Sequence, residues 1–179
     1  MEVFQKYSIK LKRLTIDKIE QVRNWRNDPK ISQYMDFKDY ITPEMQLCWF
    51  NKINNDNNYY FIVIYNNEDI GLVNIKDIDY KNKCAESGIF IYMDKYLNSD
   101  IGIRCVLCNN DFAFEYLNLE YLFGHVMAGN KRAIRFNKAF GCLLDNDQEG
   151  KDKQRYTLSK ERYLEYRIKL IKLLPKATV

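Results

Sequence analysis

The stretch Tyr59–Tyr65, YYFIVIY, is a continuous apolar run of residues that favour β-structure, and it is too short to be a core helix. A polar turn, NNED at 66–69, follows it directly. Two further strand-like segments come next, at 70–78 and at 86–93. Three such segments in succession predict the centre of a β-sheet.

Two helices are expected between this centre and a first strand at 8–12. The first helix ends at Asp28 and Pro29, because proline cannot continue a helix. Four apolar residues give it a helical spacing: Ile16, Ile19, Val22 and Trp25. The second helix begins after Thr42, an N-cap residue that is followed by proline, and runs to about Ile53.

On the C-terminal side of the centre, helices and strands alternate. The expected elements are a helix with Ile103, Leu107, Phe114 and Leu117 on one stripe, a strand at 121–127, a helix at 131–140 that ends at Gly141, two short strands near 141–146 and 153–158, and a helix at 160–173. This order predicts a mixed, mostly antiparallel sheet with helices on its faces, an α/β or α+β fold. No linker or repeat interrupts the chain, so residues 1–179 are expected to form a single domain.

The composition restricts the functional class. Apolar residues make up 46% of the 179 residues, and the net charge is +4, with lysine and arginine scattered along the chain. Scattered charge argues against a nucleic-acid groove and is compatible with an anionic small ligand. The first residues carry no apolar signal segment, and no apolar run is long enough to span a bilayer. We therefore expect a soluble, cytoplasmic protein that contacts neither nucleic acid nor a membrane.

The cysteines predict neither a disulfide framework nor a metal site. Their number, five, is odd, so they are expected to be reduced thiols. Cys105 and Cys108 form a C-x-x-C inside a helical pattern, whereas zinc would need two more ligands and a redox motif would usually begin a helix. We expect these two thiols to be packing residues and the protein to bind no metal.

Two segments resemble the GNAT superfamily of N-acetyltransferases. Residues 22–29, VRNWRNDP, with Tyr34 and Met35 following, are similar to the helix end of GNAT members that acetylate amino sugars or ribosomal-protein N-termini. Residues 130–141, NKRAIRFNKAFG, resemble the family's N-x-x-A-x-x-x-Y-x-x-x-G-F segment. The element order agrees over nearly the whole chain. The resemblance implies a GNAT fold and an enzyme that uses acetyl-CoA as cosubstrate, bound between the fourth and fifth expected strands with its pantetheine arm paired to the fourth as an added strand.

The same resemblance implies which residues contact acetyl-CoA: Ile91, Met93, Ser99, Ile101, Gly102, Asn130, Phe136 and Asn137. Two positions depart from the family pattern. The pyrophosphate loop, Q/R-x-x-G-x-G/A, falls on 97–102, where Gly102 alone matches and Asp100 adds a negative charge. Asn137 stands where the family often has the tyrosine that protonates the departing thiolate. Either another tyrosine serves, or the thiolate leaves without an acid.

Acetyl transfer to an amine needs a group that accepts the amine's proton. Glu86 begins the fourth expected strand, beside the place where the family separates two strands for the thioester. His125, the only histidine, lies on the fifth strand, and an imidazole changes protonation near neutral pH. Both are candidates for the base, and the sequence does not rank them.

The acceptor is expected to be a nucleotide-linked amino sugar, with a 4-amino-4,6-dideoxy hexose favoured. The helix end, the chain length and the run at 59–61 resemble the bacterial acetyltransferases of flagellin sugars and surface glycans, and the net positive charge suits a diphosphate. The residues expected to bind it are Trp25, Arg26, Tyr34, Phe37 and Tyr40. A protein N-terminal acetyltransferase and a non-catalytic CoA-binding module remain alternatives. The last helix is expected to be a packed cap or the face of a homodimer.

Overall fold

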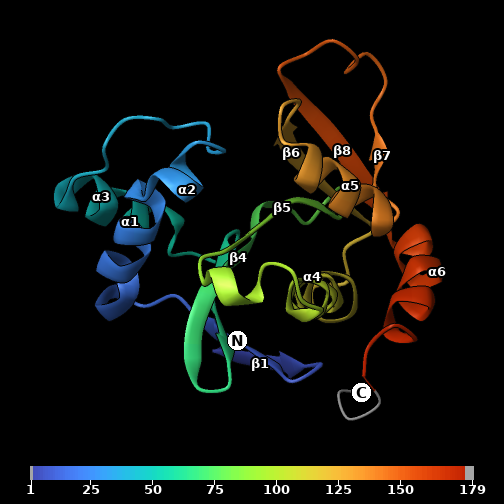
Figure 1. Cartoon of the computed structure of the whole chain (residues 1–179), viewed down its shortest axis with the longest axis horizontal. Coiled ribbons are helices and arrows are strands. Elements are labelled where there is room, and N and C mark those ends of the chain that lie inside the picture. The colour runs from blue at the N-terminus through green and yellow to red at the C-terminus, as the bar shows by residue number, and fades with distance from the viewer. Residues whose placement is uncertain (1, 176–179) are drawn as a thin grey trace.

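The computed structural model describes residues 2–175 and contains one curved sheet of eight strands with helices on both faces (Figure 1). The strands are β1 (Val3–Lys6), β2 (Ile9–Arg13), β3 (Tyr59–Tyr65), β4 (Glu68–Asp79), β5 (Cys84–Ile91), β6 (Tyr121–Met127), β7 (Leu143–Leu144) and β8 (Lys153–Ser159). Their order in the sheet is β1-β2-β3-β4-β5-β6-β8-β7. Among these eight described strands, β5 and β6 are the one parallel pair; the other neighbours are antiparallel.

The helices divide between the two faces of this sheet. They are α1 (Ile19–Asn27), α2 (Pro29–Ser32), α3 (Pro43–Ile53), α4 (Ile101–Asp111), α5 (Lys131–Ala139) and α6 (Lys160–Ile171), with short turns η1 (Ile16–Lys18), η2 (Asp94–Tyr96) and the π-helical η3 (Phe112–Tyr116). In Figure 1, α1, α2 and α3 form one group and α4, α5 and α6 another. The mixed-sheet fold expected from the sequence is confirmed.

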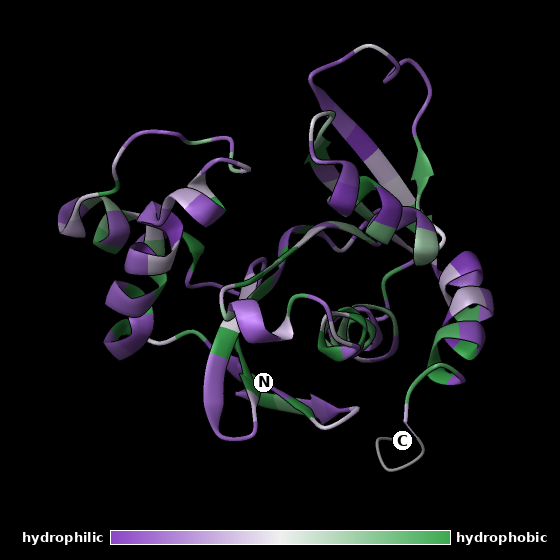
Figure 2. Ribbon diagram, in the orientation of Figure 1, coloured by the Kyte–Doolittle hydropathy of each residue, from purple (hydrophilic) through white to green (hydrophobic). Residues whose placement is uncertain are grey.

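Successive side chains of each strand project from opposite faces of the sheet, and each face forms a hydrophobic core. Buried residues of α4, such as Leu107, pack with Val73 and Ile75 on one face, whereas Trp25 and Phe50 pack with the opposite face. Figure 2 shows α1 mostly purple, as expected of a helix that buries a single stripe and leaves its other sides in water.

Two elements, β1 and α2, are not expected from the sequence. β1 pairs with β2 through a turn at Tyr7 and Ser8, whose φ angles of 55° and 61° are uncommon for residues other than glycine. The usual glycine or asparagine signal of a hairpin is therefore missing. The predicted helix stop before Pro29 is confirmed, but α2 begins there, because Asp28 caps it by accepting a hydrogen bond from the amide of Lys30 at 3.0 Å.

A fork opens between β5 and β6. Their parallel pairing covers only 84–86 against 121–123. Beyond Glu86, β5 continues to pair with β4 alone, so its other backbone edge has no strand partner among residues 2–175. Gly124 begins the divergence on β6, where an added Cβ would lie 3.1 Å from the carbonyl oxygen of Ser87. The fork lies where the resemblance places the cosubstrate.

A buried carboxylate joins the two ends of the described chain. The side chain of Asp111, at the end of α4, is 0% exposed. It accepts hydrogen bonds from the hydroxyls of Tyr7 at 2.6 Å and Tyr163 at 2.5 Å, and it forms ion pairs with Lys6 at 3.0 Å and Arg167 at 2.9 Å. These partners come from β1 with its turn and from α6. The side chain of Asp111 on α4 therefore connects segments that lie far apart in the sequence.

Gly71→Ala is expected to destabilise the protein by about 1–3 kcal/mol, the range for an overpacked site. A Cβ at Gly71 would overlap the carbonyl oxygen of Phe90 on the neighbouring strand, and backbone cannot move aside without loss of pairing. Urea denaturation would measure the change. Gly129→Ala is the matched control, because no atom lies within 4 Å of its added Cβ. Equal midpoints for the two variants would contradict the expectation.

Candidate active site

Three ionisable side chains meet across adjacent strands at the base of the fork. Lys76 on β4 places its Nζ 3.1 Å from Oε2 of Glu86 on β5. The other carboxylate oxygen of Glu86 lies 3.4 Å from Nδ1 of His125 on β6. The structure therefore brings together Glu86 and His125, the two candidate bases predicted from the sequence. It also places Lys76 beside them, which was not predicted as a site residue.

The arrangement distinguishes the two ring nitrogens of His125. Nδ1 faces the carboxylate, which favours the tautomer with its proton on Nδ1, so the lone pair of Nε2 is available. The imidazole is 29% exposed and Glu86 is 21% exposed, which leaves the ring the more accessible group. Glu86, held between a lysine and the imidazole, is better suited to orient the ring than to take a proton itself.

These side chains lie on the sheet face covered by α1 and α3. Ala85 belongs to the core beneath α4, so its neighbour Glu86 projects from the opposite face. Tyr60 lies on that opposite face, where burial raises the pKa of its hydroxyl to about 12 and keeps it neutral. An acceptor that approached the fork from this side would meet the imidazole.

Two of the candidate cosubstrate residues, Ile91 and Met93, lie at the end of β5 and just beyond it. Ile91 ends the strand, and both it and Met93 are half-buried against the α4 core. The amide of Met93 bonds to the carbonyl oxygen of Ile70 at 3.3 Å, so it is not available to a ligand. Its side chain can still contribute an apolar contact.

The loop before α4 is ordered by its own side chains. Ser99 accepts a hydrogen bond from the amide of Ile101 at 3.2 Å, which leaves the amides of Gly102 and Ile103 as the first-turn donors that could reach a phosphate. Asp100 does not cap the helix; its carboxylate accepts from Nε of Arg104 at 2.8 Å. The guanidinium thus offsets the negative charge near the loop.

Three of the predicted cosubstrate residues belong to α5 and its N-cap. Asn130 caps the helix by accepting from the amide of Ala133 at 3.0 Å. An added Cβ at Gly102 would lie 3.7 Å from the ring of Phe136, so this ring packs beside the loop. Asn137 donates to the carbonyl oxygen of Ala133 at 2.9 Å and therefore has a structural role in the helix. No sequence signal identifies a replacement for the usual tyrosine acid.

Two of the residues expected to bind the acceptor are buried to different extents. Trp25 is 6% exposed and stacks on Tyr92 with ring centroids 5.3 Å apart, so its ring packs in the core, and its contact with an acceptor stays a prediction. Arg26 is half-buried, with its guanidinium 5.0 Å from the centre of the Trp49 ring and a 3.3 Å hydrogen bond to Gln46. Burial lowers the pKa of Arg26. Within the described part of the chain, no carboxylate forms an ion pair with it.

The aromatic loop between α2 and α3 is accessible. Tyr34, Phe37 and Tyr40 are 52%, 42% and 68% exposed. The hydroxyl of Tyr40 accepts a hydrogen bond from Arg23 on α1 at 3.0 Å, so this ring lies against the helix. Tyr34 and Phe37 remain the aromatic candidates for contact with an acceptor.

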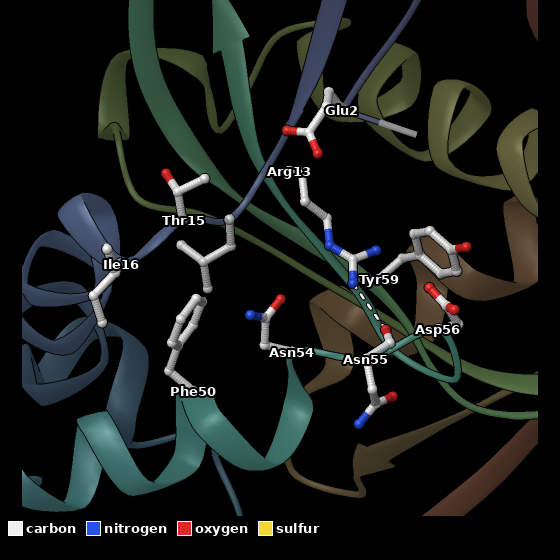
Figure 3. Close-up of a pocket in the computed structure, with 10 residues that line it drawn as sticks. Glu2, Arg13, Thr15, Ile16, Phe50, Asn54, Asn55, Asp56 and Tyr59 are labelled. Atoms are coloured by element: carbon white, nitrogen blue, oxygen red, sulfur yellow. Dashed lines mark hydrogen bonds between the residues drawn. The ribbon is translucent and has the colours of Figure 1, made fainter.

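A separate hollow of 490 Å³ lies between β2, η1 and α3. Figure 3 shows residues that line it. Arg13 projects into it and donates to the carbonyl oxygens of Asn55 and Asn58 at 2.9 and 2.7 Å. Its guanidinium also lies 4.3 Å from the centre of the Tyr59 ring. The arginine is thus used to hold a loop, and none of the candidate catalytic residues lines the hollow.

The two cysteines of the C-x-x-C are packing residues, as expected. Both are 0% exposed, and burial raises the pKa of Cys108 to about 12, so neither is a reactive thiolate. Among residues 2–175, no helix has the length and apolarity needed to cross a membrane.

Comparison with known proteins identifies the family of this architecture. Residues 8–142 match the acetyltransferase (GNAT) domain. Acetyltransferase PseH of Campylobacter jejuni subsp. jejuni (strain 81-176) is 30% identical over 148 residues, which cover 79% of this chain and 89% of PseH. Apo FdhC, described as a nucleotide-linked sugar GNAT, has a TM-score of 0.79 at 22% identity and covers 97% of this chain and 98% of its own. Spermidine N-acetyltransferase from Vibrio cholerae, solved with CoA and spermine, has a TM-score of 0.75 at 20% identity over 88% of this chain and 98% of its own.

At these identities the two solved structures establish the fold alone. The domain match and the C. jejuni relative also establish the family, because they cover most of the sequence. Together with the forked sheet, they show that the chain belongs to the GNAT family of acetyl-CoA-dependent acetyltransferases.

Proposed function

We propose that the protein transfers the acetyl group of acetyl-CoA directly to the amine of a nucleotide-linked amino sugar, with His125 as the general base. The observation that carries the catalytic part is the contact of Nδ1 of His125 with Glu86 at the base of the fork, 3.4 Å apart. It leaves Nε2 free to accept a proton, which is the arrangement that a base needs.

The reaction balances without a metal or a redox partner. The neutral amine forms a bond to the thioester carbonyl carbon, and its proton passes to Nε2 of His125. The tetrahedral intermediate then breaks its carbon–sulfur bond, which releases the amide and the CoA thiolate. A thiol has an ordinary pKa of about 8.5, so the thiolate is a tolerable leaving group although Asn137 cannot protonate it.

The proposal that the acceptor is a nucleotide-linked amino sugar rests on similarity to other proteins and on the net positive charge of the chain. FdhC is described as a nucleotide-linked sugar GNAT, and the helix end at 22–29 resembles members that acetylate amino sugars. A 4-amino-4,6-dideoxy hexose is the favoured sugar. The five cysteines are all free thiols, which suits a reducing compartment and therefore a cytoplasmic reaction. A homodimer through α6, where Leu164 and Ile168 are 43% and 59% exposed, stays a prediction.

The test is a thiol-release assay with acetyl-CoA and a panel of amines. We expect turnover with UDP- or dTDP-linked amino sugars and none with N-terminal peptides, spermidine or aminoglycosides. Activity confined to peptides would favour an N-terminal acetyltransferase and contradict the sugar acceptor. Tight CoA binding with no transfer to any amine, and no thioester hydrolysis, would indicate a non-catalytic module instead.

A further inference from the structure

Two cations on β8, Lys153 and Arg155, lie on the active-site face of the sheet. Arg155 is the cross-strand partner of His125, and Lys153 is the partner of Met127 two residues further along β6. Partners in an antiparallel pair project from the same face. Both cations therefore lie beside the proposed base, toward the open end of the fork.

The guanidinium of Arg155 is one aromatic ring away from the imidazole. It lies 4.2 Å from the centre of the Phe123 ring, whose centroid is 6.1 Å from that of His125. Its one carboxylate contact in the part of the chain that is described is Asp145, 3.4 Å from Nε. The side chain remains 44% exposed, so its other nitrogens can reach a second anion.

Lys153 already holds an anion that comes from across the fork. Its Nζ forms an ion pair with Asp36, which lies in the loop between α2 and α3 beside the exposed Phe37. The lysine side chain is 42% exposed and the aspartate 64% exposed. An ion pair in so much water is weak and is readily exchanged for one with a more highly charged partner.

We infer that Lys153 and Arg155 bind the phosphate groups of the acceptor, and that Asp36 occupies Lys153 until the acceptor replaces it. The inference rests on the proposed function, since a peptide or a polyamine would offer these cations no phosphate. A diphosphate presents two negative charges, and the planar guanidinium fork matches phosphate oxygens. Displacement of Asp36 frees the loop that carries Tyr34 and Phe37 to settle over the bound acceptor.

The experiment compares the double variant K153Q/R155Q with the wild-type protein in steady-state assays that vary one substrate while the other is saturating. The KM for the UDP-linked amino sugar should rise about tenfold or more, the scale of lost charge-assisted hydrogen bonds. The kcat and the KM for acetyl-CoA should stay within about twofold, because neither cation takes part in the chemistry. D36N should instead lower the KM for the sugar nucleotide. K10Q, which removes an exposed cation of β2, is the matched control.

Calorimetry with UDP supplies a second readout, with CoA present in saturating amount so that its own site is filled. The wild-type protein should bind UDP less tightly as salt is raised, and K153Q/R155Q should bind it at least about tenfold more weakly. An unchanged KM in the double variant, while the wild-type protein acetylates the sugar nucleotide, would overturn this inference and leave the proposed function intact. If the wild-type protein binds no UDP and acetylates peptides alone, both fall. A higher KM in D36N would overturn the role of Asp36.

Discussion

His125→Ala is expected to lower kcat by about a hundredfold or more, the usual scale for loss of a general base. The dissociation constant of acetyl-CoA should stay the same, because the imidazole lies on the acceptor side of the sheet and not along the unpaired edge of β5. Thiol release at saturating acetyl-CoA measures the first quantity, and calorimetry measures the second.

Glu86→Gln separates the two candidate roles. If Glu86 orients His125, the amide should keep part of that contact and lower kcat by about tenfold or less. If Glu86 is itself the base, Glu86→Gln should lower kcat by about a hundredfold or more and by more than His125→Ala does. Tyr121→Ala is the matched control, since this residue lies on the same strand and face and is 51% exposed. Near-normal turnover in both His125→Ala and Glu86→Gln would mean that the proton leaves through water.

Asp111→Ala is expected to lower the free energy of unfolding by about 3–5 kcal/mol, the range for a buried charge pair that loses one partner. The substitution removes the acceptor of Tyr7 and Tyr163 and leaves the positive charge of Arg167 without its buried counter-ion. Urea denaturation at neutral pH measures the loss. Glu115→Gln is the control, because this partner of Lys6 and Arg167 is 42% exposed and its ion pairs are in water. A similar loss in both variants would contradict a special role for Asp111.

The same carboxylate predicts how stability depends on pH. Burial alone would raise the pKa of Asp111, but hydrogen bonds from Tyr163, Tyr7, Lys6 and Arg167 outweigh it and hold the pKa below the ordinary value. Unfolding therefore releases a carboxylate that binds protons more readily, so its contribution is complete well above pH 4 and is lost as the pH falls through the lower, folded value. Asp111→Ala should be less sensitive to acid than the wild-type protein. Parallel acid-unfolding curves would contradict this.

Periodicity alone was sufficient to predict most of the fold. The bounds of Tyr59–Tyr65 agree with those of β3, because an uninterrupted apolar run of this length has few alternatives. The strand expected at 121–127 agrees with β6. β1 was not predicted, since its two-residue turn at Tyr7 and Ser8 lacks the residues that usually mark a hairpin.

The site was predicted less completely, for a physical reason. Glu86 and His125 were selectable because their residue types suit proton transfer, but their 3.4 Å contact depends on strand register, which the sequence does not display. Lys76 and Arg155 carry no local signal and become relevant only through cross-strand pairing. The burial of Trp25 also depends on packing: the residue belongs to a segment that resembles the family, and its ring is 6% exposed.

The linkage of both chain ends through Asp111 has a consequence for biosynthesis. Asp111 leaves the ribosome 52 and 56 residues ahead of Tyr163 and Arg167, an interval of several seconds at about 5–20 residues per second. Until then, Lys6 and Tyr7 are the partners of the Asp111 carboxylate that have already been synthesised. The buried carboxylate therefore lacks the hydrogen bonds of Tyr163 and Arg167 until α6 has been translated. Nascent chains that stall before α6 should accordingly be good substrates for cellular quality control.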